Sequence, residues 1–471
     1  MKAIYKILFF VLAGIGCAAC EKPELSESHG TQINGLLNVT MQIPDNPAEY
    51  YATKKGPYAE GEEIIVKLPT TDENPLDVSR IICTVSLEHN CYINPPMTGE
   101  MDFTEPLQVT VTDALGNQHH HSIRVEPTPP KTTYELLWEK NATSLGLTDR
   151  NTTGIAINGQ YLVLQHYNGS IYYYDRSTGE QVKTIPAAST FMMKARFDDA
   201  GHLITSRENV YGAGFMVYYY SEEDMQHHLL LDYTAAAGCP TDLGYNMNVI
   251  GNVLEGKSYI YGLTQNDMNI YYWELQDGEL VTPADQPNML RYGPAGGNWP
   301  SVPAVQRASL DDASDHYIAY NKWTNAYAID DEHKAHFNIF TSAMEVTELN
   351  IANHEHRILG FNVFDCDADK YLALYDMTAD AYAGGAASLK VFDITDPAKM
   401  ELAPTDAGYN DFRLFTGTGT GYIQNYFNWG DVSVYKEETA TGYDVYIATT
   451  AVGFDPNQSI VQVYKMTYFR Q

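Results

Sequence analysis

A pattern that returns along the last three quarters of the chain constrains its fold most. It is clearest at residues 197–224, FDDAGHLITSRENVYGAGFMVYYYSEED. This stretch reads as a strand, an Asp/Gly turn, a second strand, a polar loop and an aromatic strand that ends in an acidic turn. A recurring pattern of this length indicates a fold built from similar supersecondary units.

Five further segments carry the same pattern. In each, Gly, Asn or Asp lies between two runs of β-forming residues, which is typical of a tight hairpin. The segments are 156–180, 253–279, 308–346, 364–398 and 434–466. Their second strands begin about 40 to 75 residues apart, a spacing that suits four-stranded propeller blades better than sandwich strands. We therefore predict a six-bladed β-propeller over residues 131–471.

The last copy lacks a fourth strand, and a spare strand lies upstream of the first copy. Only three strands are predicted from residue 434 to the end, whereas YELLWEK at 134–140 has no hairpin partner nearby. We predict that this segment completes the sixth blade and covers an otherwise exposed sheet edge. The alternative is an ordinary linker strand.

The charge of the chain excludes some partners. With 29 basic and 60 acidic residues the formal net charge is -31, which argues against nucleic acid and against electrostatic binding to anionic lipid. Tyrosine is abundant, with 36 copies against 16 phenylalanines, which fits strands and polar recognition surfaces.

The first 20 residues, MKAIYKILFFVLAGIGCAAC, have a lysine-bearing start and an apolar run of signal-peptide length. Ala18-Ala19-Cys20 resembles a lipoprotein processing site, so we predict lipidation at Cys20, with Cys17 as the fallback acceptor. Lipidation would anchor the mature protein to a membrane without a spanning helix. Residues 21–30 would form the tether, and a soluble secreted product is the alternative.

Residues 31–127 form a separate predicted domain. Short β-rich segments such as 62–69, 79–87 and 107–113 are separated by Pro, Gly and Asp turns, a small β-sandwich pattern. Cys83 and Cys91 can join across a short hairpin in an oxidising compartment. The Pro-rich end of this domain favours a semi-rigid spacer.

Two motifs resemble known bacterial surface proteins. DFTEPLQVTVTDALGNQHHHSIRVEP at 102–127 is similar to the end of the immunoglobulin-like modules that begin many Bacteroidota surface lipoproteins. VFDITDPAKM at 391–400 resembles the blade endings of bacterial surface propellers. The whole chain resembles uncharacterised lipoproteins of that group, many of which accompany polysaccharide-uptake machinery. The resemblance implies an immunoglobulin-like first domain, lipid-anchored display on the outer membrane at the cell surface, and a role in glycan capture.

In a propeller, the loops between second and third strands share one face with the loops between blades, and function usually lies on such loops. A sugar site needs exposed aromatic rings beside amide, carboxylate or guanidinium groups. The predicted ligand-binding residues are Trp299, Trp323, Trp429, Tyr167, Tyr211, Tyr245, Arg207, Asn266, Asp267 and Arg291. The alternative for each Trp is a wedge between blades, and for each Arg an ion pair that fixes a loop.

Four histidines, His333, His336, His354 and His356, fall on the same predicted face beside several carboxylates. A transition-metal site is conceivable there, but chance clustering of surface histidines is the favoured interpretation. The chain contains no GxSxG elbow, no phosphate-binding loop and no dinucleotide fingerprint. We therefore expect no cofactor, no metal and no identifiable catalytic residue.

These features predict a carbohydrate-binding lipoprotein that captures poly- or oligosaccharide without catalysis. Its expected partners are a glycan, the membrane through a lipid anchor and an outer-membrane transporter complex, and nucleic acid is excluded. One alternative is a polysaccharide lyase or glycoside hydrolase on the same propeller face. Another is a protein-binding scaffold of an outer-membrane complex. Fold alone does not choose among them.

Overall fold

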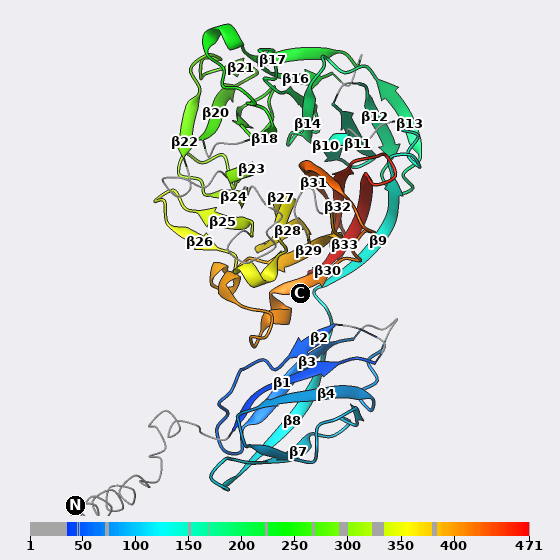
Figure 1. Ribbon diagram of the computed structural model, residues 1–471, viewed down its shortest axis with the longest axis vertical. Coiled ribbons are helices and arrows are strands. Elements are labelled where there is room, and N and C mark those ends of the chain that lie inside the picture. Colours follow the sequence, from blue (N-terminus) through cyan, green and yellow to red (C-terminus); the bar gives the residue numbers. More distant parts are fainter. Residues whose placement is uncertain are drawn as a thin grey trace, which may run out of the picture. The chain divides into compact units, whose positions relative to one another are not determined.

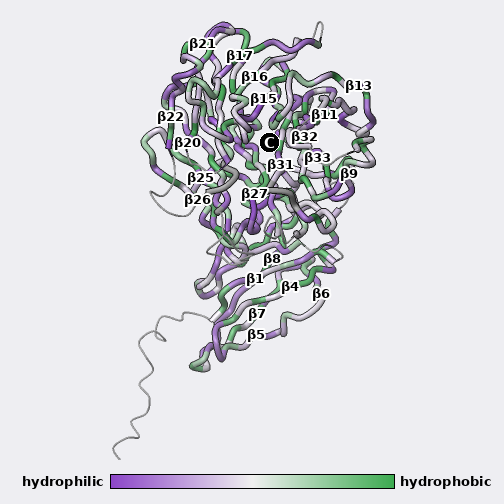
Figure 2. Tube along the Cα trace, turned by 45° about the horizontal axis from the view of Figure 1, so that its top comes forward, coloured by the Kyte–Doolittle hydropathy of each residue, from purple (hydrophilic) through white to green (hydrophobic). Residues whose placement is uncertain are grey.

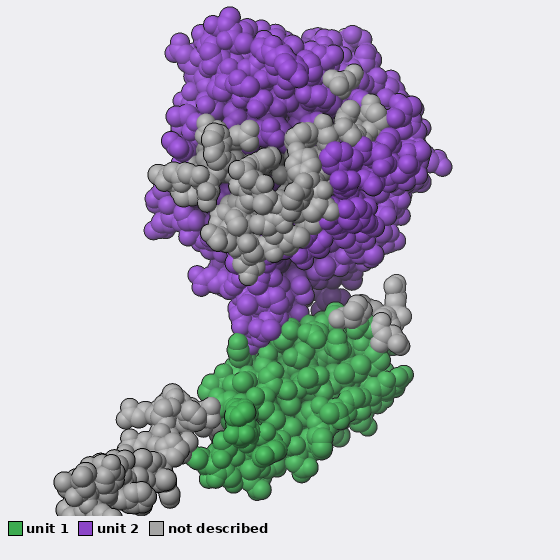
Figure 3. All heavy atoms as spheres, viewed as in Figure 1, with its two compact units in different colours: residues 1–128 green, residues 129–471 purple. Residues whose placement is uncertain are grey.

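The computed structural model is all-β and contains two compact units, residues 1–128 and 129–471 (Figures 1 and 3). It describes residues 35–470 except 45, 47, 71–74, 149–151, 168, 222–224, 266–268, 292–299, 323–333 and 379–383. No α-helix is present in this part of the chain. Hydrophobic and hydrophilic stretches are interspersed along both units (Figure 2), and no helix among the described residues has the length and apolar character needed to span a membrane.

The first unit is formed by two four-stranded sheets around a shared hydrophobic core. Their strand orders are β2-β1-β4-β6 and β3-β8-β7-β5, with β3 and β8 parallel. The strands are β1 (Leu36–Gln42), β2 (Glu49–Tyr51), β3 (Glu63–Pro69), β4 (Ile81–Leu87), β5 (Tyr92–Asn94), β6 (Glu100–Met101), β7 (Leu107–Thr112) and β8 (Gln118–Thr128). Alternate residues of β3, namely Ile64, Val66 and Leu68, are buried in this core, as the two-residue period of a strand requires. Cys83 and Cys91 are both free thiols, so the disulfide considered for them is not formed.

The described residues of the second unit form six sheets, and each of the six hairpin copies seen in the sequence falls in a different sheet. The strand orders are β10-β11-β12-β13, β14-β15-β16-β17, β18-β19-β20-β21 with β22 also paired to β20, β23-β24-β25-β26, β27-β28-β29-β30 and β31-β32-β33-β9.

The bounds of the strands in this unit are as follows. The first three sheets and β9 comprise β9 (Thr132–Asn141), β10 (Thr152–Ile157), β11 (Tyr161–His166), β12 (Ile171–Asp175), β13 (Gln181–Ile185), β14 (Met192–Phe197), β15 (Leu203–Arg207), β16 (Phe215–Tyr220), β17 (His227–Tyr233), β18 (Asn246–Ile250), β19 (Lys257–Leu263), β20 (Asn269–Gln276), β21 (Glu279–Leu280) and β22 (Asn288–Arg291). The remaining strands are β23 (Pro300–Arg307), β24 (His316–Lys322), β25 (His336–Phe340), β26 (Val346–Glu348), β27 (Arg357–Cys366), β28 (Asp369–Met377), β29 (Ala387–Asp393), β30 (Arg413–Thr416), β31 (Asn425–Thr439), β32 (Gly442–Gly453) and β33 (Ile460–Phe469).

The first strands of successive sheets contact one another in a closed series. β10 contacts β14, β14 contacts β18, and the series continues through β23, β27 and β31 back to β10 (Figure 1). Two glycines permit this close approach. A Cβ at Gly154 of β10 would lie 2.6 Å from the backbone nitrogen of Ala195, and one at Gly360 of β27 would lie 2.9 Å from the backbone of Asp431. A β-bulge interrupts the ladder beside each glycine.

The last sheet is completed by a strand from the start of the unit. β9 pairs antiparallel with β33, for example at Trp138 and Val463, which confirms the pairing predicted for residues 134–140 (Figure 1). The Trp138 side chain is buried, and its Nε1 donates a hydrogen bond to the backbone oxygen of Arg176 at 2.9 Å. Since Arg176 follows β12 of the first sheet, this contact joins the sixth sheet to the first.

Candidate functional site

The structure brings some of the predicted ligand-binding residues together. Several of the predicted residues lie outside the described part of the chain, namely Cys20, Asn266, Asp267, Trp299, Trp323 and His333. Tyr167, Tyr211 and Trp429 meet at one end of the second unit with Phe191, which the sequence analysis did not single out. We call these four side chains the aromatic rim.

Four segments position the rings of the rim. Tyr167 follows β11, Phe191 precedes β14, Tyr211 follows β15, and Trp429 lies in β31. The centroid of the Tyr167 ring is 5.5 Å from that of Trp429 and 5.7 Å from that of Phe191, which in turn is 5.9 Å from Tyr211. Tyr211 is 93% exposed, so the series of rings runs from the half-buried indole out to solvent.

At the rim, three residues other than glycine adopt left-handed backbone conformations, which such residues rarely adopt. Phe191, Tyr211 and Asp242 have φ of 61°, 54° and 61°. Hydrogen bonds from other loops hold these turns: Glu208 N donates to Phe191 O at 2.9 Å, and Asp242 N donates to Asn209 O at 3.0 Å. Backbone strain of this kind is concentrated at ligand-binding positions in proteins, which supports the rim as a candidate site.

A buried carboxyl group lies behind the rings. Glu208 is 4% exposed, and the Tyr167 hydroxyl donates to its Oε2 at 3.4 Å. Burial, together with the neighbouring charge of Asp242, raises the pKa of Glu208 to about 8. Burial also raises the pKa of Asp242. At neutral pH the protonated form of Glu208 therefore predominates, and it can donate a hydrogen bond as well as accept one.

The other described candidates lie elsewhere or are covered. Tyr245 is 3% exposed and packs against Met193 beneath the rim, so its ring does not face solvent. Arg207 Nη1 lies 3.5 Å from the sulfur of Met216 on the adjacent strand. Arg291 is exposed at the end of β22, in the third sheet.

The described histidines have separate partners. His336 Nδ1 pairs with the Glu348 carboxylate, and His356 Nδ1 donates to Thr378 O at 3.0 Å. His354 Nδ1 donates to Glu355 O at 2.8 Å, and burial lowers the pKa of His354 to about 4. Within the described ranges, no group of three or more His, Cys, Asp or Glu side chains is arranged to hold a metal ion.

Replacing Glu208 with Gln is expected to stabilise the protein at alkaline pH. The pKa of the folded state is raised from 4.5 to about 8, so folded Glu208 keeps a proton that the unfolded chain releases, and stability falls as pH rises through this window. Gln does not ionise and avoids that loss. We expect Glu208→Gln and the wild type to have equal free energies of unfolding near pH 5, and that of Glu208→Gln to be about 2–3 kcal/mol higher near pH 9.

Urea unfolding followed by tryptophan fluorescence measures this difference in the second unit, which holds all five tryptophans. Glu279→Gln, at an exposed position on β21, is the control and should show no such difference between the two pH values. Equal pH profiles for Glu208→Gln and the wild type would contradict the buried, protonated state.

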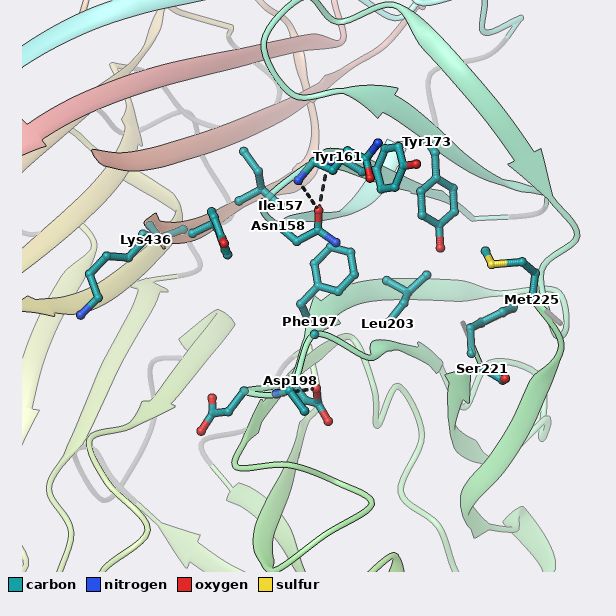
Figure 4. A pocket seen from close by; sticks show the side chains of 18 of the residues that line it. Ile157, Asn158, Tyr161, Tyr173, Phe197, Asp198, Leu203, Ser221, Met225 and Lys436 are labelled. Atoms are coloured by element: carbon teal, nitrogen blue, oxygen red, sulfur yellow. Dashed lines mark hydrogen bonds between the residues drawn. The ribbon is translucent and has the colours of Figure 1, made fainter. Parts of the chain in front are cut away.

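A second candidate site is a cleft of about 960 Å³ at the opposite ends of β11 and β15 (Figure 4). β11 runs from Tyr161 in the cleft to the residue before Tyr167 in the rim, and β15 runs from Leu203 in the cleft to the residue before Glu208. The cleft is lined by turns and strands of the first, second and sixth sheets. The cleft has no signature in the sequence because each turn is short and the space forms only between neighbouring sheets.

The chain is similar to a solved structure described as a DUF4623 family protein from Bacteroides eggerthii DSM 20697, at 11% identity over 93% of this chain and 98% of that one, with a TM-score of 0.49. It is similar to hydrazine synthase from Kuenenia stuttgartiensis at 10% identity, over 82% and 94% of the two chains, with a TM-score of 0.37. No curated protein matches the sequence. Residues 136–453 match the family model described as Domain of unknown function (DUF8500), and the chain therefore belongs to that family.

Proposed function

We propose that the protein is a lipid-anchored lipoprotein of the bacterial outer membrane that binds poly- or oligosaccharide at the cell surface without cleaving it. In this proposal the first unit is an immunoglobulin-like spacer and the second a six-bladed β-propeller. The six sheets, the closed series of contacts between their first strands and the completion of the sixth sheet by β9 support the propeller. The predicted signal and Cys20 support the anchor.

The aromatic rim is the observation that carries the binding function. Sugars present flat C–H faces and rings of hydroxyls, and they are bound by aromatic rings that stack on those faces. Tyr211 offers such a ring to solvent, and Phe191 and Tyr167 extend it inward. The half-buried carboxyl group of Asp242 would accept hydrogen bonds from sugar hydroxyls, and Glu208 would hold the Tyr167 hydroxyl behind the rings.

Tyr211→Ala is expected to weaken glycan binding about tenfold, because it removes the exposed stacking ring. Isothermal titration of the mature chain against a panel of plant, host and bacterial polysaccharides measures the affinity. Tyr92→Ala, which removes a 69% exposed tyrosine from β5 of the first unit, is the matched control and should leave the affinity unchanged. The proposal fails if the wild type binds nothing in the panel, or if Tyr211→Ala binds as tightly as the wild type.

One observation favours a second candidate function, cleavage of the bound glycan. A carboxylic acid that is protonated at neutral pH is the group a glycosidase uses to donate a proton to the leaving oxygen, and Glu208 has that property. Chromatography of the titration samples separates the two functions. Release of shorter sugars by the wild type, abolished in Glu208→Gln, would select the enzyme, whereas unchanged glycans select the binding protein.

A further inference from the structure

We infer that the cleft at the turn end of the first, second and sixth sheets is a second glycan site, selective for sugars that carry a carboxylate. This site is separate from the aromatic rim, since the two lie at opposite ends of β11 and β15. Its volume of about 960 Å³ is at the upper end of the range for ligand pockets and has room for several sugar rings. Strands of three different sheets form its walls, so the packing of the sheets fixes its shape.

The walls of the cleft are rich in aromatic rings. Tyr161 and Tyr173 meet edge to face with ring centroids 5.5 Å apart, and Phe197 approaches from the second sheet while Tyr435 belongs to the sixth. Figure 4 shows the Tyr161, Tyr173 and Phe197 rings around the cavity. As in the rim, rings of this kind suit the C–H faces of sugars.

Lys183 supplies the charge that would select the ligand. Its Nζ is 4.4 Å from the centroid of the Tyr173 ring and 5.1 Å from that of Tyr161, and 3.7 Å from the sulfur of Met225. Among the described residues, no carboxylate forms an ion pair with this ammonium group. Lys183 is therefore a half-buried cation that lies against aromatic rings in the cleft.

The other charged groups of the cleft already have partners. The Asp198 carboxylate accepts hydrogen bonds from the backbone nitrogens of Ala200, His202 and Val253 and pairs with the His202 ring. Asp199 Oδ2 accepts from Gly251 N at 3.1 Å. Lys436 Nζ donates to the backbone oxygen of Asp365 at 2.7 Å. Lys183 and Lys436 are the two cations of the lining, and Lys183 is the one that lies against the tyrosine rings, so we infer that an incoming anion pairs with Lys183.

A uronic acid residue satisfies these groups together. Its carboxylate would pair with Lys183, its C–H face would lie on the half-buried rings of Phe197 and Tyr435, and its hydroxyls would meet Gln160 and Ser221 at the margin of the cleft. Inorganic phosphate or sulfate would pair with the ammonium group but would not stack on the rings. A neutral sugar would stack on the rings but would not pair with the ammonium group.

Titration of the mature chain with pentamers of galacturonate, mannuronate and glucuronate, and with neutral cellopentaose, tests the inference. We expect at least one uronate pentamer to bind at least tenfold more tightly than cellopentaose, and added salt to weaken that binding. Lys183→Gln should lower the uronate affinity at least tenfold, whereas Lys183→Arg should keep most of it. Lys257→Gln is the matched control, because Lys257 also lies over a tyrosine ring, at 5.2 Å from the Tyr259 centroid, outside the cleft.

Three results would overturn the inference: no uronate pentamer binds, cellopentaose binds equally well, or Lys183→Gln binds like Lys257→Gln. Tyr211→Ala keeps this test distinct from that of the rim. Uronate binding that survives Tyr211→Ala but not Lys183→Gln supports the cleft whatever the fate of the proposed function. Uronate binding lost in Tyr211→Ala and retained in Lys183→Gln assigns the uronate to the rim and rejects the cleft.

Discussion

Asp431→Ala is expected to lower the free energy of unfolding of the second unit by about 3–5 kcal/mol, because it leaves two buried cations without their anion. The Asp431 carboxylate is 2.6 and 2.8 Å from the two terminal nitrogens of Arg196 and 3.4 Å from Lys194 Nζ. Burial alone would raise the pKa of Asp431, but Arg196 and Lys194 hold it below its usual value. The carboxylate is therefore ionised at neutral pH, and its stabilising effect is lost only as pH falls through that lowered pKa.

Urea unfolding at neutral pH, read by tryptophan fluorescence, measures the loss. Asp312→Ala is the matched control: it also removes a carboxylate from an ion pair, with Lys257, but the Asp312 side chain is 90% exposed. The control should lose less than about 1 kcal/mol, as is usual for surface pairs. A loss in Asp431→Ala no larger than in the control would mean that the ion cluster between β14 and β31 is solvated.

Trp138→Ala is also expected to lower the free energy of unfolding of the second unit by about 3–5 kcal/mol. The indole belongs to β9, packs into the core formed by the first and sixth sheets and donates to Arg176 O at 2.9 Å. A Cβ at Gly179 would lie 3.0 Å from it, so the turn after β12 is fitted closely to this ring. Its removal leaves a cavity where the two sheets meet.

Leu136→Ala is the comparison within the same strand, because Leu136 is 38% exposed. This variant should lower the free energy of unfolding by less than about 1 kcal/mol. The fluorescence of the remaining tryptophans reports both variants. Equal losses in the two variants would show that β9 contributes through its backbone ladder alone and that the indole does not join the sheets.

The hairpins could be predicted from the sequence, because they follow from Gly, Asn and Asp between β-forming runs of neighbouring residues. The long-range pairing of residues 134–140 with the last strand could also be predicted, because one copy of the pattern lacked a strand and one strand was spare. The close approach at Gly154 and Gly360 could not be predicted, because it depends on backbone atoms of a neighbouring sheet. The cleft beside Lys183 has the same origin, since no single hairpin contains it.

The rim was predictable only in part. Tyr167 and Tyr211 lie on loops that converge near Trp429 of β31, whereas Tyr245 is covered by long-range packing against Met193. Glu208 was missed because ENV at 208–210 resembles an ordinary polar loop. Its burial comes from distant segments around Tyr167, Phe191 and Asp242, which no local pattern reveals.

The pairing of β9 with β33 has a consequence for biosynthesis. β9 is the first strand of the second unit to leave the ribosome, and its partner at 460–469 is the last. Until translation has passed β33, β9 exposes unpaired backbone groups that invite association with other chains. Completion of this unit therefore waits for the synthesis of β33, and a nascent chain arrested before residue 460 is a natural client for chaperones that shield strand edges.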